Sequence, residues 1–176
     1  MSSGPLSAGD IRRLFTELAA ELDARGTRAE VFLVGGAAIA LCFDGRRATR
    51  DLDAAFAPTS DVRSAAAIVA EREGLDADWL NDAVKGYLHG PDPNAVRYFE
   101  APGLLVDVAS AEYLLAMKLF SSRAEADADD IALLYRVVGF TTVDEGLDLV
   151  ERAYPGRSVQ PKVQFLLEEI VASLQN

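Results

Sequence analysis

Apolar residues recur along this chain with a helical period in some segments and in short strand-like runs in others. The first helical stripe, over residues 11–24, consists of Ile11, Leu14, Phe15, Leu18 and Leu22. Asp10 is the expected cap of this helix and Gly26 its expected end. Similar patterns predict helices over 37–43, 59–72, 111–122, 127–138, 143–153 and 161–174, and a short one around 78–84. Strands are predicted over 31–34, 50–56, 96–99 and 104–108.

Strands and helices therefore mix up to about residue 110, and helices alone follow. This order predicts an α/β or α+β fold, with a small mixed sheet and a helical C-terminal part. No Pro/Gly-rich linker marks the boundary. We therefore expect residues 1–176 to form a single compact unit, with an α/β core over 27–110 and a helical part over 111–176.

Composition narrows the class of protein. Half of the 176 residues are apolar and 26% are charged, which is typical of a globular domain. No apolar run approaches the ~18 residues that a membrane span needs, so no membrane association is expected. Residues 1–10 lack the features of a signal peptide and are expected to form a loose leader. The single cysteine, Cys42, is expected to be reduced and buried, which favours a cytoplasmic location.

The formal net charge of -11 argues against a general nucleic-acid binder. This charge does not exclude a local basic patch, and Arg46, Arg47 and Arg50 form a cluster that could guide a polyanionic acceptor. The alternative is that Arg50 pairs with Asp51 or Asp53. An acidic protein of this kind would also suit a basic partner.

The candidate chemistry is concentrated in residues 35–53, which read GGAAIALCFDGRRATRDLD. Gly35 and Gly36 follow an apolar strand and open a short helix, where backbone N–H groups can approach a phosphate. Asp51 and Asp53 are two residues apart on a predicted strand, so their carboxylates share one face. Two carboxylates held in this way can bind hard divalent cations. The segment therefore contains the parts for metal-assisted phosphoryl or nucleotidyl transfer.

Polar residues also interrupt apolar elements further along the chain. Lys118 lies on a helix that is apolar on nearly every side, and it either snorkels to the surface or neutralises phosphate charge at a cleft. Asp127 falls on the inner stripe of the next helix and Asp130 at its edge; Asp127 is alternatively a stabiliser of the helix N-terminus. Asp107 stands alone in an apolar strand, where a carboxylate is costly unless it is paired or ligating. On a strand next to that of Asp51 and Asp53, it would complete a metal cage.

Two other residues that attract attention have ordinary explanations. His89 is the only histidine, and a single histidine in a loop is expected to be a surface residue. Trp79 has no neighbours that suggest a stacking platform, so it is expected to be a packing residue. There is no cluster for zinc and no G-x-x-x-x-G-K-[ST] loop, which excludes those two classes of site.

Gly35-Gly36, the short helix and the run Thr49-Arg-Asp51-Leu-Asp53 together resemble the DNA polymerase β-like nucleotidyltransferase superfamily. The later segment narrows the resemblance: it runs from Ser110 to Lys118 and through Arg123 to Asp130. The chain is thus similar to nucleotidyltransferase toxins of the AbiEii and MenT type. The resemblance covers residues 30–57 and 104–135. It implies a small mixed sheet of the nucleotidyltransferase type.

The resemblance also implies roles for individual residues. Gly35 and Gly36 would hold the nucleoside triphosphate, together with Lys118 and Arg123. Asp51 and Asp53 would bind catalytic magnesium, in a two-metal site. Asp130, or less directly Asp127, would supply the late acidic motif. Asp107 matches the third carboxylate of the wider superfamily, although the toxin-like branch relies on its helical acid instead.

The function that these residues favour is metal-dependent transfer of a nucleotide from a nucleoside triphosphate to an acceptor. The resemblance implies the tRNA 3′ end as acceptor, and a toxin with a cognate antitoxin protein. Two alternatives stay open: the same fold modifying a protein or small molecule, and a non-catalytic, antitoxin-like binding module.

Overall fold

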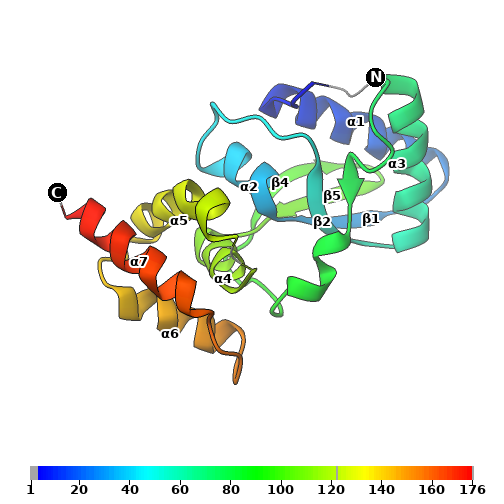
Figure 1. The fold of residues 1–176 in the computed structure, drawn as a ribbon. Helices are drawn as coiled ribbons and strands as arrows, with labels where there is room; N and C mark the ends of the chain where they lie inside the picture. Colours follow the sequence, from blue (N-terminus) through cyan, green and yellow to red (C-terminus); the bar gives the residue numbers. More distant parts are fainter. Residues whose placement is uncertain (1–3, 122, 176) are drawn as a thin grey trace. The chain divides into compact units, whose positions relative to one another are not determined.

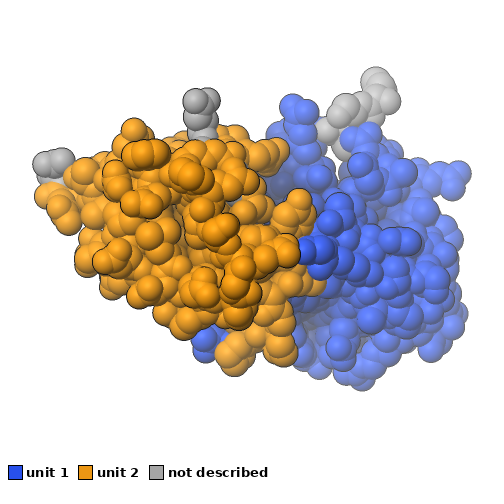
Figure 2. Space-filling model, turned by 60° about the horizontal axis from the view of Figure 1, so that its bottom comes forward, with its two compact units in different colours: residues 1–86, 94–109 blue, residues 87–93, 110–176 orange. Residues whose placement is uncertain are grey.

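The computed structural model describes residues 4–121 and 123–175. The chain divides into two compact units, one of residues 1–86 and 94–109 and the other of residues 87–93 and 110–176 (Figure 2). The elements of unit 1 are α1 (Ala8–Ala24), β1 (Ala29–Leu33), α2 (Gly35–Cys42), β2 (Leu52–Ala57), α3 (Thr59–Glu73), β3 (Leu80–Asn81), β4 (Val96–Ala101) and β5 (Leu104–Val108). The 3-10 helix η1 (Ala83–Tyr87) belongs to unit 1 except for its last residue. The elements of unit 2 are α4 (Ala111–Ser121), α5 (Ala124–Val138), α6 (Val143–Ala153) and α7 (Pro161–Leu174).

Unit 1 is built on a five-stranded mixed sheet in the order β3-β2-β1-β5-β4 (Figure 1). β1 runs antiparallel to β2 and parallel to β5, β3 runs parallel to β2, and β4 runs antiparallel to β5. The predicted fold class, a small mixed sheet with a helical C-terminal part, is thereby confirmed.

Alternation along the strands divides this sheet into a buried and a more open face. In β1, Val31 and Leu33 are buried, whereas Glu30 is exposed and Phe32 is half-buried. α1 and α3 contact each other and the strands, and both present buried apolar residues to the sheet. Trp79 completes this core: it is fully buried, and its indole N–H donates to the Ala66 carbonyl at 3.0 Å. The prediction that Trp79 is a packing residue is confirmed.

Three local predictions for unit 1 are wrong. α1 begins at Ala8 rather than Ile11, because Ser7 is its N-cap and Asp10 closes a capping box with it. Part of the short helix expected around 78–84 is instead the strand β3, which pairs with β2. Leu6, expected in a loose leader, is buried and forms an antiparallel bridge with Thr49. Residues 1–3 of that leader lie outside the described residues.

Cys42 also differs from expectation. It ends α2 and is exposed, although it was expected to be buried. The buried residues of this short helix are Ala37, Ala38, Ile39 and Ala40, and Cys42 is its last residue, beyond that buried part.

Unit 2 combines four helices with the segment 87–93. α4 contacts α5 and α6, and α7 contacts α5 and α6. The predicted helices are confirmed within a few residues, except that the expected end of the first at residue 122 lies outside the described residues. Within the described ranges, every helix is too short or too polar to cross a membrane.

The segment 87–93 is held by an aromatic cluster. His89 stacks on Tyr113 at 3.8 Å between ring centres, and the Tyr113 hydroxyl donates to the Gly90 carbonyl at 3.0 Å. Asp92 accepts hydrogen bonds from the N–H and hydroxyl of Ser110, just before α4. His89, expected to be a plain surface residue, is therefore a half-buried member of a packed cluster.

Candidate functional site

The glycine turn after β1 is set tightly against Asp53. Gly35 has φ +67°, in the left-handed region that favours glycine. A Cβ atom at Gly35 would lie 2.8 Å from Oδ2 of Asp53. No side chain caps the start of α2, and the first backbone N–H groups of a helix have no partner within the helix. The turn can therefore present N–H groups to an anion directly beside a carboxylate.

Asp51 and Asp53 lie at the beginning of β2. The strand begins at Leu52, so Asp51 precedes it rather than belonging to it, although Leu52 is buried between the two less buried aspartates. Burial and the neighbouring charges of Asp53 and Asp78 raise the pKa of Asp51. The two carboxylates are therefore close enough to repel each other, which is the electrostatic situation that a bound cation relieves.

Asp107 is placed differently from what we expected. β1 separates β5 from β2, so Asp107 does not lie on a strand next to that of Asp51 and Asp53. Asp107 is level with Phe32 of β1, and its carboxylate accepts a hydrogen bond from the Arg97 guanidinium. No group of three or more His, Cys, Asp or Glu side chains within the described residues is arranged to share a metal ion. Metal ligation by Asp107 stays a prediction.

The arginine cluster is partly neutralised by its own neighbour. Arg46 and Arg47 both approach Asp44, at 3.5 and 3.1 Å, and the Arg46 side chain is 95% exposed. Arg50 is exposed, and the ion pairs recorded among the described residues do not include one to Asp51 or Asp53. The structure thus gives no support to the alternative that Arg50 pairs with these aspartates.

In unit 2, Lys118 is held by two carboxylates. Its ammonium lies 2.7 Å from Oδ1 of Asp127 and 2.9 Å from Oδ2 of Asp130, and its side chain is only 18% exposed. Lys118 therefore does not snorkel into solvent. Burial opposes its charge, but the hydrogen bonds and charges of the two aspartates outweigh burial and raise the pKa of Lys118.

Asp127 is a buried charged residue, with only 4% of its surface exposed. Burial opposes its ionisation, but hydrogen bonds from Lys118 and from the Arg123 backbone N–H lower its pKa overall. The 3.0 Å bond from that N–H means that Asp127 also stabilises the start of α5. This supports the interpretation of Asp127 as a stabiliser of the helix N-terminus, and its part in the late acidic motif stays a prediction. The Arg123 side chain is exposed, and its nucleotide contact stays a prediction.

Sequence reasoning missed two polar residues beside the strand aspartates. Asn81 of β3 is the register partner of Asp53, and Asp78 is near enough to raise the pKa of Asp51. The missed signal was β3 itself, since a two-residue strand leaves no alternating pattern to detect. The expectation that Lys118 faces one cleft with Asp51 and Asp53 stays a prediction.

Comparison with protein families gives a match over most of the chain. The model described as "Nucleotidyltransferase of unknown function (DUF6036)" matches residues 10–154. Comparisons with curated proteins and with solved structures gave no match. The matched range includes the glycine turn, the strand aspartates and the Lys118 cluster.

Proposed function

Because the chain belongs to the DUF6036 family of nucleotidyltransferases, we propose that it transfers a nucleotide from a nucleoside triphosphate to a hydroxyl acceptor in a magnesium-dependent reaction. The observation that carries this proposal is the contact between the glycine turn and Asp53. The proposed site for the phosphates, at the glycine turn, and the proposed metal ligand Asp53 would then be adjacent within unit 1.

The residues present fit magnesium. Mg²⁺ keeps several waters and is usually bound by one or two carboxylates together with substrate phosphates, so a protein cage of three acids is not required. Asp51 and Asp53 supply two carboxylates whose mutual repulsion favours a cation. When bound, magnesium would neutralise phosphate charge and polarise the α-phosphate.

The other residues would act by binding and positioning. The N–H groups at Gly35 and Gly36 would hold the phosphates of the nucleoside triphosphate. Lys118 would exchange part of its contact with Asp130 for phosphate oxygens, and Asp127 would keep the ammonium oriented. Catalysis of this type depends on position and charge rather than on covalent chemistry of the protein.

For the biological role we propose a toxin of a toxin–antitoxin pair, with the tRNA 3′ end as the first acceptor to test. The support is the resemblance of segments 30–57 and 104–135 to such toxins. Transfer to a protein or a small molecule is the alternative that the formal net charge of -11 favours.

A labelling experiment tests the proposal. The full chain is incubated with magnesium and total RNA, and with each nucleoside triphosphate labelled in turn at the α- or the γ-phosphate. We expect the α-label and not the γ-label to become attached to RNA, and EDTA or the Asp53→Asn substitution to prevent it. Absence of α-label on RNA with all four nucleotides would reject the RNA acceptor, and absence on every protein and small-molecule fraction as well would reject nucleotidyl transfer.

The toxin role needs a separate measurement. Induced expression of the wild-type chain should arrest bacterial growth, and expression of the Asp53→Asn chain at an equal level should not. Equal growth with both chains would mean that the transfer activity of this protein is not toxic to the cells.

A further inference from the structure

The edge strand β3 presents Asn81 on the same face of the sheet as Asp53. The two residues are register partners in the parallel ladder of β2 and β3, and neighbouring strands of a sheet lie about 4.8 Å apart. The residues before them, Leu52 and Leu80, are also register partners and are buried. Because successive side chains of a strand point to opposite faces, Asp53 and Asn81 both point to the face opposite these leucines.

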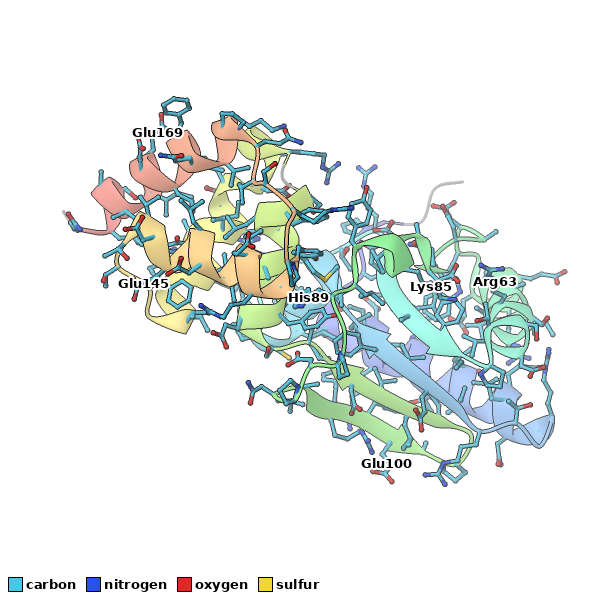
Figure 3. All side chains as sticks on the ribbon, turned by 90° about the horizontal axis from the view of Figure 1, so that it is seen from below. Arg63, Lys85, His89, Glu100, Glu145 and Glu169 are labelled. Atoms are coloured by element: carbon cyan, nitrogen blue, oxygen red, sulfur yellow. The ribbon has the colours of Figure 1, made fainter. Side chains whose placement is uncertain are left out.

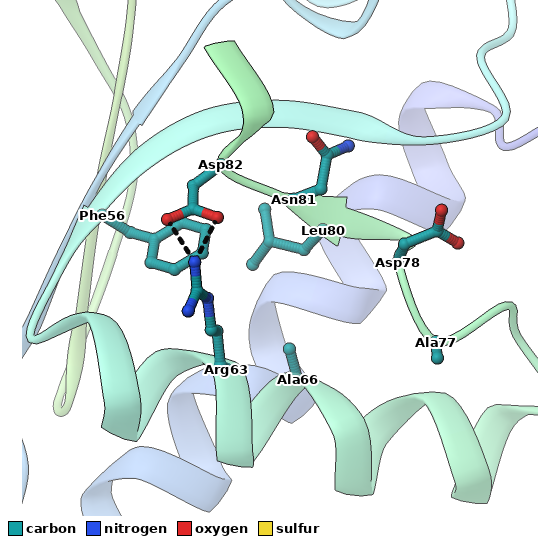
Figure 4. A pocket seen from close by; sticks show the side chains of 8 residues that line it. All are labelled: Phe56, Arg63, Ala66, Ala77, Asp78, Leu80, Asn81 and Asp82. Carbon is teal, nitrogen blue, oxygen red and sulfur yellow. Dashed lines mark hydrogen bonds and ion pairs between the residues drawn. The ribbon is translucent and has the colours of Figure 1, made fainter. Parts of the chain in front are cut away.

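Figure 4 shows how β3 divides its side chains between the two faces. The Leu80 side chain lies on the side of α3, near Phe56, and the amide of Asn81 points to the other side of the strand. α3 contacts both β2 and β3, so the side of Leu80 is the packed side of this part of the sheet. Asn81 therefore belongs to the more open face, which carries Asp53.

One end of the Asn81 amide is fixed by the turn that follows the strand. Its Oδ1 accepts a hydrogen bond from the Ala83 backbone N–H at 3.2 Å, which closes the turn from β3 into η1. The other end of the amide is then the NH2 group, with two N–H donors. Among residues 4–121 and 123–175, this NH2 group has no hydrogen-bond acceptor. Two donors are therefore available to a ligand on the face of Asp53.

The chain on both sides of Asn81 is held in place. Before it, the buried Trp79 donates its indole N–H to a backbone carbonyl of α3 at 3.0 Å. After it, Asp82 binds Arg63 of α3 at 2.8 and 2.9 Å and Lys85 of η1 at 2.7 Å. Figure 3 shows Arg63 and Lys85 side by side at this end of the sheet. A donor on such a fixed segment needs little reorganisation when a ligand arrives.

Magnesium at Asp53 would bring a phosphate oxygen within reach of the Asn81 NH2 group. The ligands of Mg²⁺ lie about 2.0–2.1 Å from the ion in an octahedron, so two neighbouring ligands are about 3 Å apart. A phosphate oxygen that shares the ion with Asp53 is therefore about 3 Å from its carboxylate. That displacement is smaller than the strand spacing of about 4.8 Å that separates Asp53 from Asn81.

The chemistry of an N–H donor favours the α-phosphate over the acceptor hydroxyl. A non-bridging phosphate oxygen carries negative charge, and hydrogen bonds to charged acceptors are the stronger ones. The attacking hydroxyl oxygen needs its lone pair for the new bond to phosphorus, so a donor bound to it would slow the attack. The amide is also neutral, and it would not compete with magnesium for Asp53.

We propose that the NH2 group of Asn81 donates a hydrogen bond to a non-bridging oxygen of the α-phosphate of the nucleoside triphosphate, while its Oδ1 stays bound to the N–H of Ala83. The proposal rests on the proposed function and adds to it a residue that touches the reacting group. Asn81 gives up no proton and forms no covalent bond. It holds the α-phosphate in one orientation and stabilises the charge on its oxygen.

NMR of the side-chain amides tests the contact without any reaction. The ¹⁵N-labelled full chain, in magnesium, receives each nucleoside triphosphate analogue in which a methylene group replaces the oxygen between the α- and β-phosphorus, so that transfer is blocked. The Asn81 signal is assigned by its absence from the Asn81→Asp variant. We expect a saturable shift of this signal with at least one analogue, and no shift of the Asn94 side-chain signal, which is the internal control.

Two substitutions separate the NH2 group from the turn. Asn81→Asp keeps an oxygen that can accept from Ala83 but removes the NH2 group, and Asn81→Ala removes both without adding a charge. Both variants should lower kcat about 100-fold, with little change in the KM for the nucleoside triphosphate, and only Asn81→Ala should lower Tm. A wild-type kcat in Asn81→Asp would overturn the proposal. A loss of kcat in Asn81→Asp alone would also overturn it, because the added charge would then be the cause.

Sulfur substitution identifies the atom that Asn81 contacts. Each α-phosphorothioate isomer of the nucleotide has a sulfur atom, a weak hydrogen-bond acceptor, in place of one non-bridging oxygen. Wild type should be slowed by the isomer whose sulfur faces Asn81, and Asn81→Ala should lose no further rate with that isomer, because the contact is already absent. If both isomers slow Asn81→Ala as much as wild type, Asn81 does not contact the α-phosphate.

This proposal and the proposed function fail in different ways. Shifts of the Gly35 and Gly36 amides without a shift of the Asn81 side chain would keep nucleotide binding at the glycine turn and reject the role of Asn81. If none of these signals shifts with any analogue, the nucleotide site itself is rejected, and the role of Asn81 with it. A shift of the Asn81 signal without any transfer of α-label would keep the contact and reject the transfer reaction.

Discussion

Gly35 and Asp53 are so close that a Cβ atom on the first would lie 2.8 Å from a carboxylate oxygen of the second. Real Cβ atoms do not tolerate such an approach, so either the turn or the aspartate would have to move. The two residues are 18 positions apart in the sequence, and the antiparallel pairing of β1 with β2 brings them together. The glycine is therefore required by the geometry of the candidate metal site as well as by the turn.

Gly35→Ala should be destabilising and should displace Asp53. The positive φ costs a residue with a Cβ about 1–3 kcal/mol. Gly36 is the matched control, because a Cβ there would meet only Thr49 Oγ1 at 3.8 Å, an ordinary contact. We expect a lower free energy of unfolding in urea for Gly35→Ala and little change for Gly36→Ala. Equal stability of the two variants would contradict this account of the turn.

Gly36→Val should impair nucleotide binding more than folding. Gly36 is exposed at the start of α2, where a bulky side chain would stand between an incoming phosphate and the backbone N–H groups. Calorimetry with a nucleoside triphosphate and magnesium measures the affinity, and urea unfolding measures the stability. An unchanged affinity would show that the phosphates bind elsewhere.

Asp51→Asn and Asp53→Asn should each reduce nucleotidyl transfer by on the order of 100-fold or more, because several kcal/mol of charge stabilisation depend on the metal. Both residues lie outside the buried core, so the folded state should persist. Rates are measured with α-labelled nucleotide and stability by thermal unfolding. Full activity of Asp53→Asn in a correctly folded protein would end the metal-site hypothesis.

The pKa of Asp82 gives a stability prediction with a defined pH range. Hydrogen bonds from Lys85 and Arg63 lower this pKa from 3.8 to about 2. The stabilisation of the folded state by these ion pairs is therefore fully present above about pH 3.8, and it is lost as the pH falls to about 2. Asp82→Asn should lower Tm at neutral pH, and its difference from wild type should shrink over that interval. A difference that is constant with pH would mean that the ion pairs contribute nothing.

The periodicity of the chain was sufficient to predict most of the architecture. The apolar stripe of α1 and the alternation in β2 are local properties, and local patterns survive in the sequence. β3 was not predicted, because a strand of two residues is too short to show an alternating pattern. Its place in the sheet depends on pairing with β2. The N-cap of α1 was predicted wrongly for a related reason. Both Ser7 and Asp10 are good capping residues, and the hydrogen bonds that they make to each other are visible only in the structure.

The candidate site shows the same division. Asp51 and Asp53 could be named as candidates because residues two positions apart share a face on any strand. The placement of Asp107 could not, since the order of strands in a sheet is a non-local property. The Lys118 cluster is an intermediate case. Its charged residues were noticeable in the sequence because they lie on apolar helices. That Asp127 and Asp130 contact the same ammonium could be seen only once α4 was packed against α5.

Lys118→Ala should cost stability as well as activity. Removing one member of a buried ion pair leaves an uncompensated charge and typically costs about 3–5 kcal/mol, and here Asp127 is 4% exposed. Lys118→Met keeps the volume without the charge and separates the packing contribution from the electrostatic one. Urea unfolding should rank wild type above Lys118→Met, and Lys118→Met above Lys118→Ala.

The pH dependence gives the sign of each contribution. The pKa of Asp127 is lowered, so its part of the stabilisation is present above its ordinary value and is lost as the pH falls. The pKa of Lys118 is raised, so its part is present below its ordinary value and is lost as the pH rises through the raised pKa. The stability difference between wild type and Lys118→Met should therefore be largest near neutral pH and shrink at both extremes.

Lys118→Arg should restore little activity, because the larger planar guanidinium does not fit between Asp127 and Asp130 as the ammonium does. If Lys118→Met loses stability but binds nucleoside triphosphate as tightly as wild type, the lysine holds α4 to α5 and has no part in phosphate binding.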